Sequence, residues 1–335
     1  MKKYNVGVVG IGVVGTEMVR LLLRRNFPIK SLKILAKHQR IETIDGQDYP
    51  VEVTTGASFE GMDFAFFAGT EGDKGASKEF GMAAAMGGCT VIDNGDDYRM
   101  EPWVPLVIPE INSEALDGHA GLIANPNCST IIALMALAPL YAKNKIRRII
   151  ASTYQAVSGT GAKAVVELTK QAMDWSLEKE IACSVYPHRI LFNVIPAVGS
   201  FNDDSGESTE EIKMCRETQK ILGDDSIRIS NTCVRVPVLN AHSISLNVEF
   251  EKPITPQEAR EILLKASGVK VIDNVKENQY PMPISASGVE DVLVGRIRKD
   301  KSVENGLVLW CSGDNIWKGA ALNAIQIAEY LIKRR

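Results

Sequence analysis

The alternation of hydrophobic and polar positions divides the chain into two parts. Over the first 130 residues, short apolar runs alternate with stretches of helical periodicity, which is typical of parallel β-α-β units. The strands predicted in this part are Asn5–Val9, Leu32–Leu35, Phe64–Phe67, Thr90–Ile92, Leu106–Ile108 and Leu122–Ala124. We therefore expect an α/β domain with a mainly parallel sheet at the N-terminal end.

The remaining residues carry longer alternating strands separated by few helices, which predicts a mixed or antiparallel sheet covered on one side. These strands are Arg148–Tyr154, Arg228–Val238, Ser243–Phe250, Val292–Arg298 and Leu307–Trp310. Capping boxes at Ser208–Glu211 and Thr255–Glu258 mark two helix starts, the second with proline at the first helical position. A final helix, from about Asn315 to Ile332, is expected to pack back on the first domain.

Composition narrows the class of protein. A length of 335 residues favours two domains, and 45% hydrophobic with 24% charged residues is ordinary for a globular chain. With a net charge of −3 and no basic cluster among aromatics, we expect neither nucleic-acid binding nor a membrane span. The six dispersed cysteines lack Cys-x-x-Cys spacing, so we predict no metal site and no disulfide framework. The chain opens without a signal peptide, and we expect a cytoplasmic protein.

A glycine-rich turn follows the first strand. Its residues are Gly10, Ile11, Gly12, Val13, Val14 and Gly15, and they open a helix over Thr16–Arg24. In a strand–turn–helix setting such glycines allow a tight turn and close approach of a pyrophosphate to the backbone. The sequence thus predicts a Rossmann-type dinucleotide-binding domain, the alternative being a purely structural glycine turn.

The end of the second strand indicates which dinucleotide binds. An acidic residue there would accept hydrogen bonds from the ribose of NAD and repel a 2′-phosphate. The chain instead reads Ala36-Lys37-His38-Gln39-Arg40, with two fixed cations and no carboxylate. We predict NADP(H), with a solvated basic turn as the alternative reading of Lys37 and Arg40.

Cys128 is the most informative single residue. It lies in Asn125-Pro126-Asn127-Cys128-Ser129-Thr130, directly before a run of helical apolar periodicity. The first turn of a helix lowers the pKa of a thiol, and its free N–H groups stabilise an oxyanion. We predict a nucleophile for carbonyl chemistry, against the alternative of a small apolar residue filling core space.

Other polar residues allow both a functional and a structural reading. Gln155 ends a strand before a glycine turn, where a simple turn residue is the alternative. Arg235 and His242 flank a break near Pro237–Asn240 that brings two strand ends together, although a lone histidine is often a satisfied core residue. Glu210 and Lys213 share one helical face, where a solvated ion pair is the ordinary interpretation.

Together these segments resemble aspartate-semialdehyde dehydrogenase over essentially the whole chain. The matching motifs are Asp93–Arg99 with Val104–Glu110, Asn125–Thr130, Thr153–Gly161, Ile229–Ser243 and Asp314–Ala321. Two positions depart from the family pattern. The spacing between Gly10 and Gly12 is one residue short, and residue 241 is Ala where Gly, Ser or Cys is expected.

The resemblance implies a role for each of these residues. Cys128 is the nucleophile, His242 the acid/base, and Gln155 orients the acyl intermediate. Substrate-binding residues are Asn127 and four charged residues: Arg235 for the substrate carboxylate, Glu210 for its ammonium, and Arg99 with Lys213 for phosphate. Ser158, Gly159 and Asn315 touch the nicotinamide cofactor.

The implied reaction is reversible reductive dephosphorylation of L-4-aspartyl phosphate to L-aspartate 4-semialdehyde through a thioester. The implied fold is a Rossmann-type domain plus an α+β catalytic and dimerisation domain with a mixed sheet. Residues 1–128, completed by a helix over 314–335, form the first, and residues 129–313 form the second, in a homodimer or dimer of dimers. The alternatives are N-acetyl-γ-glutamyl-phosphate reductase, a phosphorylating glyceraldehyde-phosphate dehydrogenase and a non-catalytic NADP-binding regulator.

Overall fold

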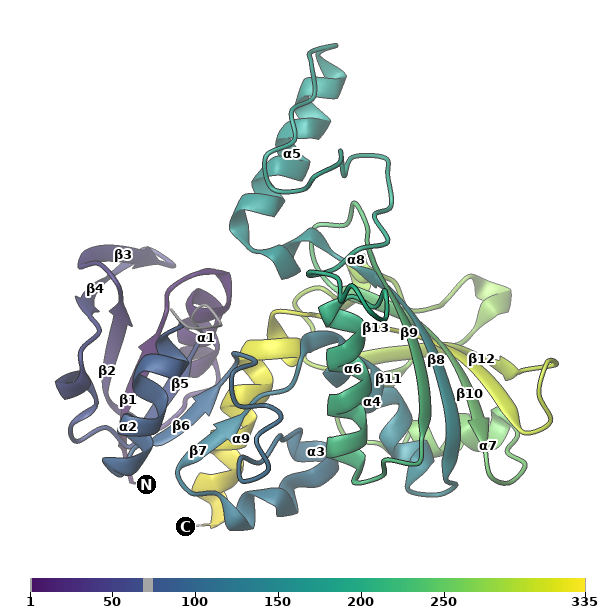
Figure 1. The fold of residues 1–335 in the computed structure, drawn as a ribbon, viewed down its shortest axis with the longest axis horizontal. Helices are drawn as coiled ribbons and strands as arrows, with labels where there is room; N and C mark the ends of the chain where they lie inside the picture. The colour runs from purple at the N-terminus through teal and green to yellow at the C-terminus, as the bar shows by residue number, and fades with distance from the viewer. Residues whose placement is uncertain (1, 69–74, 335) are drawn as a thin grey trace. The chain divides into compact units, whose positions relative to one another are not determined.

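The structure is a computed structural model that describes residues 2–68 and 75–334, so Met1 and Arg335, the ends of the predicted domains, lie outside the described residues. The chain divides into two compact units. The first comprises Met1–Asn127 and Ala320–Arg335, and the second comprises Cys128–Gly319 (Figure 1). None of the described helices is both long and apolar enough to cross a membrane.

The first unit contains a sheet with the strand order β3-β4-β2-β1-β5-β6-β7, in which only the β3–β4 pair is antiparallel. Its strands are β1 (Tyr4–Val9), β2 (Ile29–Ala36), β3 (Arg40–Ile44), β4 (Gln47–Val53), β5 (Phe64–Phe67), β6 (Thr90–Asp93) and β7 (Leu122–Ala124). The parallel α/β prediction is confirmed. The predicted strand Leu106–Ile108 is wrong, because that segment makes only an isolated bridge between Leu106 and Ala124.

The helices of the first unit are α1 (Val13–Arg24), α2 (Met82–Met86), α3 (Pro109–Asn112) and α9 (Leu322–Arg334). The last of these comes from the far end of the chain and packs against α1, α3 and β6. Arg25, just after α1, donates two hydrogen bonds of 2.8 Å to Glu329 of α9. This bidentate ion pair connects the N-terminal part of the chain to the C-terminal helix within one unit.

The second unit contains a mixed sheet with the strand order β11-β12-β13-β10-β8-β9, as expected for this part of the chain. Its strands are β8 (Ile146–Gln155), β9 (Arg228–Arg235), β10 (His242–Phe250), β11 (Val269–Val271), β12 (Val292–Lys299) and β13 (Gly306–Gly313). The helices are α4 (Cys128–Tyr141), α5 (Ala162–Ser176), α6 (Thr209–Leu222), α7 (Pro256–Leu263) and α8 (Pro283–Ala286). Both predicted capping boxes are present, at the starts of α6 and α7.

Helix α4 lies at the centre of the second unit. It contacts β8, β10, β12 and β13 on one side and α6 and α7 on the other. Its sequence is apolar on every face rather than amphipathic, and all but three of its residues are buried, the exceptions being Cys128, Pro139 and Tyr141. A helix that is hydrophobic all round is stable only when it is enclosed. Cys128, its first residue, is therefore attached to a helix that is enclosed on all sides.

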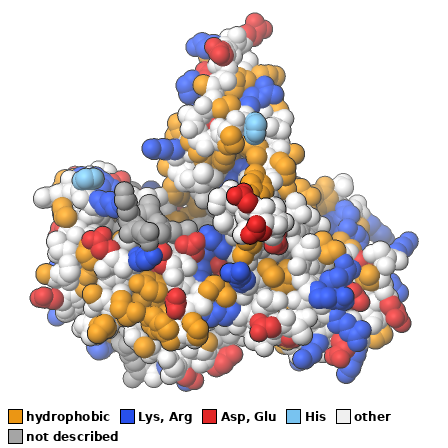
Figure 2. Space-filling view, viewed as in Figure 1, with side chains coloured by type: hydrophobic (Ala, Val, Ile, Leu, Met, Phe, Trp, Pro, Cys, Tyr) orange, Lys and Arg blue, Asp and Glu red, His pale blue; other side chains and the backbone are white. Residues whose placement is uncertain are grey.

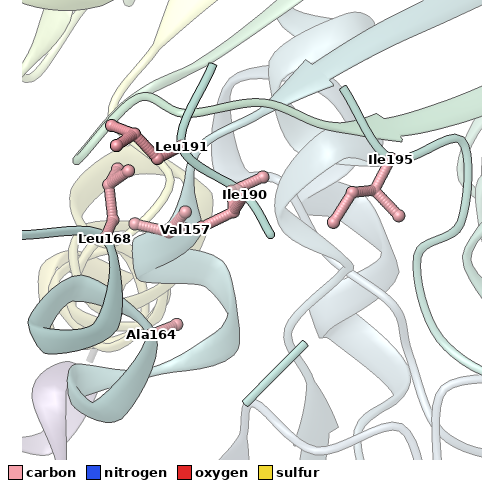
Figure 3. Packing of buried hydrophobic residues seen from close by; sticks show 6 residues of the cluster. All are labelled: Val157, Ala164, Leu168, Ile190, Leu191 and Ile195. Carbon is pink, nitrogen blue, oxygen red and sulfur yellow. The ribbon is translucent and has the colours of Figure 1, made fainter. Parts of the chain in front are cut away.

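Helix α5 and the segment that follows it extend away from the sheet of the second unit, and we call residues 162–200 the arm (Figure 1). A small apolar core joins the arm to the segment before it (Figure 3): Leu168 of α5 and Leu191 lie beside Val157. Glu167 accepts hydrogen bonds from Ser184 and from the amide of Val185. Burial raises the pKa of this carboxyl, but these hydrogen bonds outweigh burial and leave it lowered. The ionised form of Glu167 therefore stabilises the arm.

Candidate active site

One end of the mixed sheet gathers residues from distant parts of the sequence. The parallel strands β8 and β9 both end there, with Gln155 opposite Arg235 in the ladder. Strand β10 is antiparallel to β8 and begins there with His242, which lies opposite Gly313 at the end of β13. The topology of the sheet thus brings Gln155, Arg235 and His242 together and places Asn315 just beyond them.

The backbone of Ala156, directly after β8, holds two of these side chains. Its N–H donates to Nδ1 of His242 at 3.0 Å, and its carbonyl accepts from Nη1 of Arg235 at 2.7 Å. Both side chains are buried, at 0% and 6% exposure. Their positions therefore depend on main-chain geometry, which is more rigid than a contact between two side chains.

His242 is neutral and presents one nitrogen for chemistry. Burial, and then the charge of Arg235, lower the pKa of its imidazole well below the usual value, although a hydrogen bond with the backbone of Ala241 opposes this. Because Nδ1 accepts from Ala156, the proton of the neutral ring resides on Nε2. Nε2 has no hydrogen-bond partner among the described residues, although it is fully buried. A buried N–H group without a protein partner is available to donate a hydrogen bond to a substrate.

Gly159 leaves room beside this nitrogen. A Cβ atom added to Gly159 would lie 3.0 Å from Nη1 of Arg235 and 3.2 Å from Nε2 of His242. The guanidinium and the imidazole therefore border the same small space. Any larger side chain at residue 159 would fill it.

Gln155 is fixed by hydrogen bonds at both ends of its amide. Its Oε1 accepts from the hydroxyl of Thr153 at 3.0 Å, and its Nε2 donates to Glu210 at 3.0 Å. Glu210 lies in the first turn of α6 and is 9% exposed, so its carboxylate is largely shielded from solvent. The network orients a carboxylate toward the end of the sheet.

The six cysteines differ sharply in environment. Burial raises the pKa of Cys89 and of Cys311 to about 12, and it also raises that of Cys233. The negative charges of Glu210 and Glu211 also raise the pKa of Cys233. Cys128, unlike these three thiols, is only partly buried.

Gly319 packs directly on the nucleophile candidate. It belongs to a π-helical turn over Trp317–Ala321, and a Cβ added to it would lie 2.9 Å from Cβ of Cys128. π-helical turns are often found at functional sites. The backbone of Gly319 therefore closes one side of the first turn of α4 and limits the directions that the Cys128 side chain can take.

The predicted dinucleotide turn lies in the first unit. Gly10 has φ of +91°, a conformation that favours glycine, and a Cβ on Gly15 would lie 1.9 Å from the carbonyl oxygen of Gly10. A Cβ on Gly12, the N-cap of α1, meets nothing within 4 Å. The shortened loop therefore retains a tight turn, close strand–helix packing and an open N-terminus, which together fit a bound pyrophosphate.

The cations predicted to select NADP follow β2 in the same unit. Ala36 ends β2, Lys37 is exposed, and Arg40 begins β3. Arg40 donates to Glu42 at 3.0 Å across a partly exposed surface. Pairs of this kind are weak, so the guanidinium remains available to a phosphate.

Arg99 and Asn127, two predicted substrate residues, also belong to the first unit. Arg99 is 5% exposed and donates to the carbonyls of Asn125 and Asn94, at 2.9 and 2.7 Å. Asn127 is buried and is the last residue of this unit before Cys128. Arg99 therefore links its own loop to the segment that leads into the nucleophile candidate.

Several residues of the site were not predicted. Thr153 and the backbone of Ala156 hold predicted residues in place, and the carboxylate of Asp314 holds Asn240, two residues before His242. Ser158 and Asn315, which were predicted, hydrogen-bond to each other at 3.0 Å. The missed residues belong to the motifs Thr153–Gly161 and Asp314–Ala321, which was the only signal for them in the sequence, because their contacts depend on strand register.

Comparison with known proteins places the chain among semialdehyde dehydrogenases. A family model described as the NAD-binding domain of semialdehyde dehydrogenase matches residues 5–119, and one described as the dimerisation domain matches residues 137–318. The aspartate-semialdehyde dehydrogenase of Aquifex aeolicus is 47% identical, over 98% of each chain. That of Legionella pneumophila is 45% identical, over 98% of this chain and 95% of its own.

Solved structures agree. Aspartate semialdehyde dehydrogenase II from Vibrio cholerae, in complex with ASA, superposes with a TM-score of 0.94 at 36% identity, covering 99% of both chains. A probable aspartate-semialdehyde dehydrogenase from Pseudomonas aeruginosa gives a TM-score of 0.88 at 28% identity, again over 99% of each chain. The similarity therefore extends over both units.

We expect Gly319→Ala to disturb the start of α4. The added methyl has no space beside Cβ of Cys128, and overpacking of this kind costs about 1–3 kcal/mol. Chemical denaturation should show this loss, and alkylation of Cys128 by iodoacetamide should change in rate. Gly118→Ala is the matched control, because a Cβ there meets nothing within 4 Å. Equal stability and equal labelling in the two variants would contradict the contact.

Proposed function

This chain belongs to the aspartate-semialdehyde dehydrogenase family, and we propose that it interconverts L-4-aspartyl phosphate and L-aspartate 4-semialdehyde with NADP(H) through a thioester on Cys128. The observation that carries the proposal is the meeting of Gln155, Arg235 and His242 at one end of the sheet, in a chain that is 47% identical to a relative of this name. The step would serve the synthesis of lysine, methionine, threonine and isoleucine.

Cys128 is the proposed nucleophile. In the oxidative direction its thiolate adds to the aldehyde carbon, forming a carbon–sulfur bond and an oxyanion. The N–H groups in the first turn of α4 are the candidate oxyanion donors. Hydride then leaves the carbon and a thioester remains. Phosphate attacks the thioester, the carbon–sulfur bond breaks, and aspartyl phosphate leaves with the thiolate restored.

His242 is the proposed acid/base, and its Nε2–H would donate to the oxygen of the tetrahedral intermediate. Arg235 would bind the substrate carboxylate, because its planar fork suits a bidentate anion. Glu210 would meet the ammonium group, and Gln155 would orient the acyl group. An amino-acid substrate needs both signs of charge, which this set supplies.

Phosphate and the cofactor require further residues. Arg99 and Lys213 are proposed to bind phosphate, and Asn127 to contact the substrate. The turn Gly10–Gly15 would hold the pyrophosphate, with Ser158, Gly159 and Asn315 near the nicotinamide. When bound, the nicotinamide accepts or returns the hydride.

The test is the reduction of NADP by aspartate semialdehyde, which should require phosphate or arsenate. Cys128→Ala should lower turnover by roughly 10³-fold or more while NADPH binding persists, because the covalent nucleophile is lost. Cys183→Ala, which removes an exposed thiol in the arm, is the control and should keep its activity. Near-normal turnover of Cys128→Ala would exclude the thioester. Preference for N-acetylglutamate semialdehyde would instead identify the acetylated-substrate reductase.

The preference for NADP should depend on Arg40. Replacing Arg40 by Ala removes a cation that can pair with a 2′-phosphate, so KM for NADP should rise roughly tenfold while KM for NAD stays within about twofold. Lys33→Ala, an exposed lysine on β2, is the matched control. An equal change with both cofactors would contradict a role in 2′-phosphate binding.

A homodimer built through the second unit is also proposed. Residues on one face of the sheet are buried under α4, whereas alternate residues on the other face remain accessible, including Ile150 and Tyr154 at 39% and 38% exposure. Tyr154 packs on Trp310 at 5.1 Å between ring centroids, and Trp310 lines a cavity of about 310 Å³ with Ser245, Tyr280 and Met282. Exposed apolar side chains around a cavity are typical of subunit interfaces, and one family model describes this region as a dimerisation domain.

Light scattering tests the dimer. The parent protein should have about twice the 36.6 kDa mass of one chain, and Ile150→Glu should shift it toward the monomer, because a charge would be buried. Ile41→Glu, at a 62% exposed position in the first unit, is the control and should leave the mass unchanged. A parent protein of single-chain mass, or a dimeric Ile150→Glu variant, would contradict this interface.

A further inference from the structure

Ala241, the residue before His242, has a conformation that residues with a Cβ atom rarely adopt. Its φ is +69°, in the left-handed region, and the residue is completely buried. The methyl group packs with Ala286 and Leu293 in a small apolar cluster. Glycine accepts this conformation freely, whereas alanine adopts it only when the surroundings impose it. Something must therefore hold the backbone at residue 241.

The side chain of Asn315 holds the backbone of Ala241 by a hydrogen bond. Its Oδ1 accepts the N–H of Ala241 at 3.0 Å, and its Nδ2 donates to the hydroxyl of Ser158 at 3.0 Å. Asn315 is 4% exposed, so this hydrogen bond is shielded from water. Both ends of the amide are thus engaged within the second unit, and one of them fixes the strained residue.

The neighbouring residues reinforce the same turn. Asp314 accepts from Nδ2 of Asn240 at 2.8 Å and from the amide of Gly288 at 2.7 Å. Ser158 also donates to Oδ1 of Asn240 at 3.0 Å. The dipeptide Asp314–Asn315 therefore holds the dipeptide Asn240–Ala241, and the next residue along the chain is His242.

The ring of His242 is sensitive to this support. Its Nδ1 must stay at 3.0 Å from the amide of Ala156, and its Nε2 must face the space beside Gly159. A change in φ or ψ at residue 241 moves the Cα–Cβ bond of His242 directly. A displacement of about 1 Å at a catalytic group costs on the order of 10²-fold in rate.

We infer that Asn315 is a positioning residue, which holds Ala241 in its left-handed conformation and thereby fixes the imidazole of His242. This inference rests on the proposed function of His242. It differs from the expectation that Asn315 serves to contact the nicotinamide, and it involves Ala241, one of the two positions where the sequence departs from the family pattern.

A double-mutant cycle separates the two roles. Asn315→Ala removes the support, and kcat should fall roughly 100-fold, while the Kd for NADPH, measured by fluorescence, stays within about threefold. Ala241→Gly alone should keep kcat within about threefold, because glycine adopts the same conformation without support. The double variant should regain about tenfold in kcat over Asn315→Ala, since its residue 241 no longer needs the hydrogen bond.

Two further variants serve as controls for the hydrogen bond and for the rescue by glycine. Asn315→Asp retains an acceptor for the Ala241 amide, so its kcat should exceed that of Asn315→Ala by about tenfold, and equal values would contradict the hydrogen bond. Glu178→Gly relieves a left-handed residue in the exposed end of the arm, with φ of +54°, and should give no rescue when combined with Asn315→Ala.

The outcomes that would overturn the inference are distinct. A tenfold or larger rise in the Kd for NADPH in Asn315→Ala, unchanged by Ala241→Gly, would assign Asn315 to cofactor contact. An Asn315→Ala variant within threefold of the parent kcat would remove any positioning role. A parent protein inactive on aspartate semialdehyde would instead refute the proposed function itself, which keeps the two failures apart.

Discussion

The backbone of Ala156 is the constraint on which the candidate site depends. Its N–H and its carbonyl hold His242 and Arg235 at 3.0 and 2.7 Å, so one residue of main chain sets the separation of a neutral imidazole and a cation. The charge of Arg235 in turn helps to keep His242 neutral. Any movement of the β8 terminus would change the position of both groups and their electrostatic coupling at once.

Much of the fold follows from local sequence signals. The capping boxes at Ser208 and Thr255 start helices because side-chain acceptors satisfy the free N–H groups of the first turn. The β3–β4 hairpin was missed, although Asp45 and Gly46 both have positive φ in its two-residue turn. An Asp-Gly pair is a strong hairpin signal, but the flanking strands are largely exposed and lack the apolar runs that mark the other strands.

The prediction for Leu106–Ile108 failed for a different reason. An apolar run of three residues is compatible with a strand, but it also suits any buried segment. Here Leu106 makes one bridge to Ala124, and the side chain of Asn112 takes the backbone groups of Leu106 and Ile108 that a ladder would use. A side chain six residues away thus replaces strand pairing, which periodicity alone cannot reveal.

For the candidate site, the sequence motifs identified the residues but not the hydrogen bonds that hold them in place. Gln155 was named from its motif, whereas its partner Thr153 emerges only once β8 is known to end at Gln155 with both side chains on the buried face. Asn315 was named for the cofactor, whereas its contact with Ala241 depends on Gly313 lying opposite His242 in the β10–β13 ladder. Such contacts depend on register, which no local pattern encodes.

The register of β8 also separates the candidate site from the proposed dimer interface in the second unit. Along β8, Ala151, Thr153 and Gln155 face the buried side with the candidate site, while Ile150 and Tyr154 face the accessible side. A slip of one residue would exchange the two sets and place Gln155 on the apolar accessible face. A single register of β8 is therefore required both by the candidate site on the buried face and by the proposed dimer interface on the accessible face. The pairing of every residue from Arg148 to Gln155 with β9, and of most of them with β10 as well, makes that slip costly, as does the packing of α4 on the buried face.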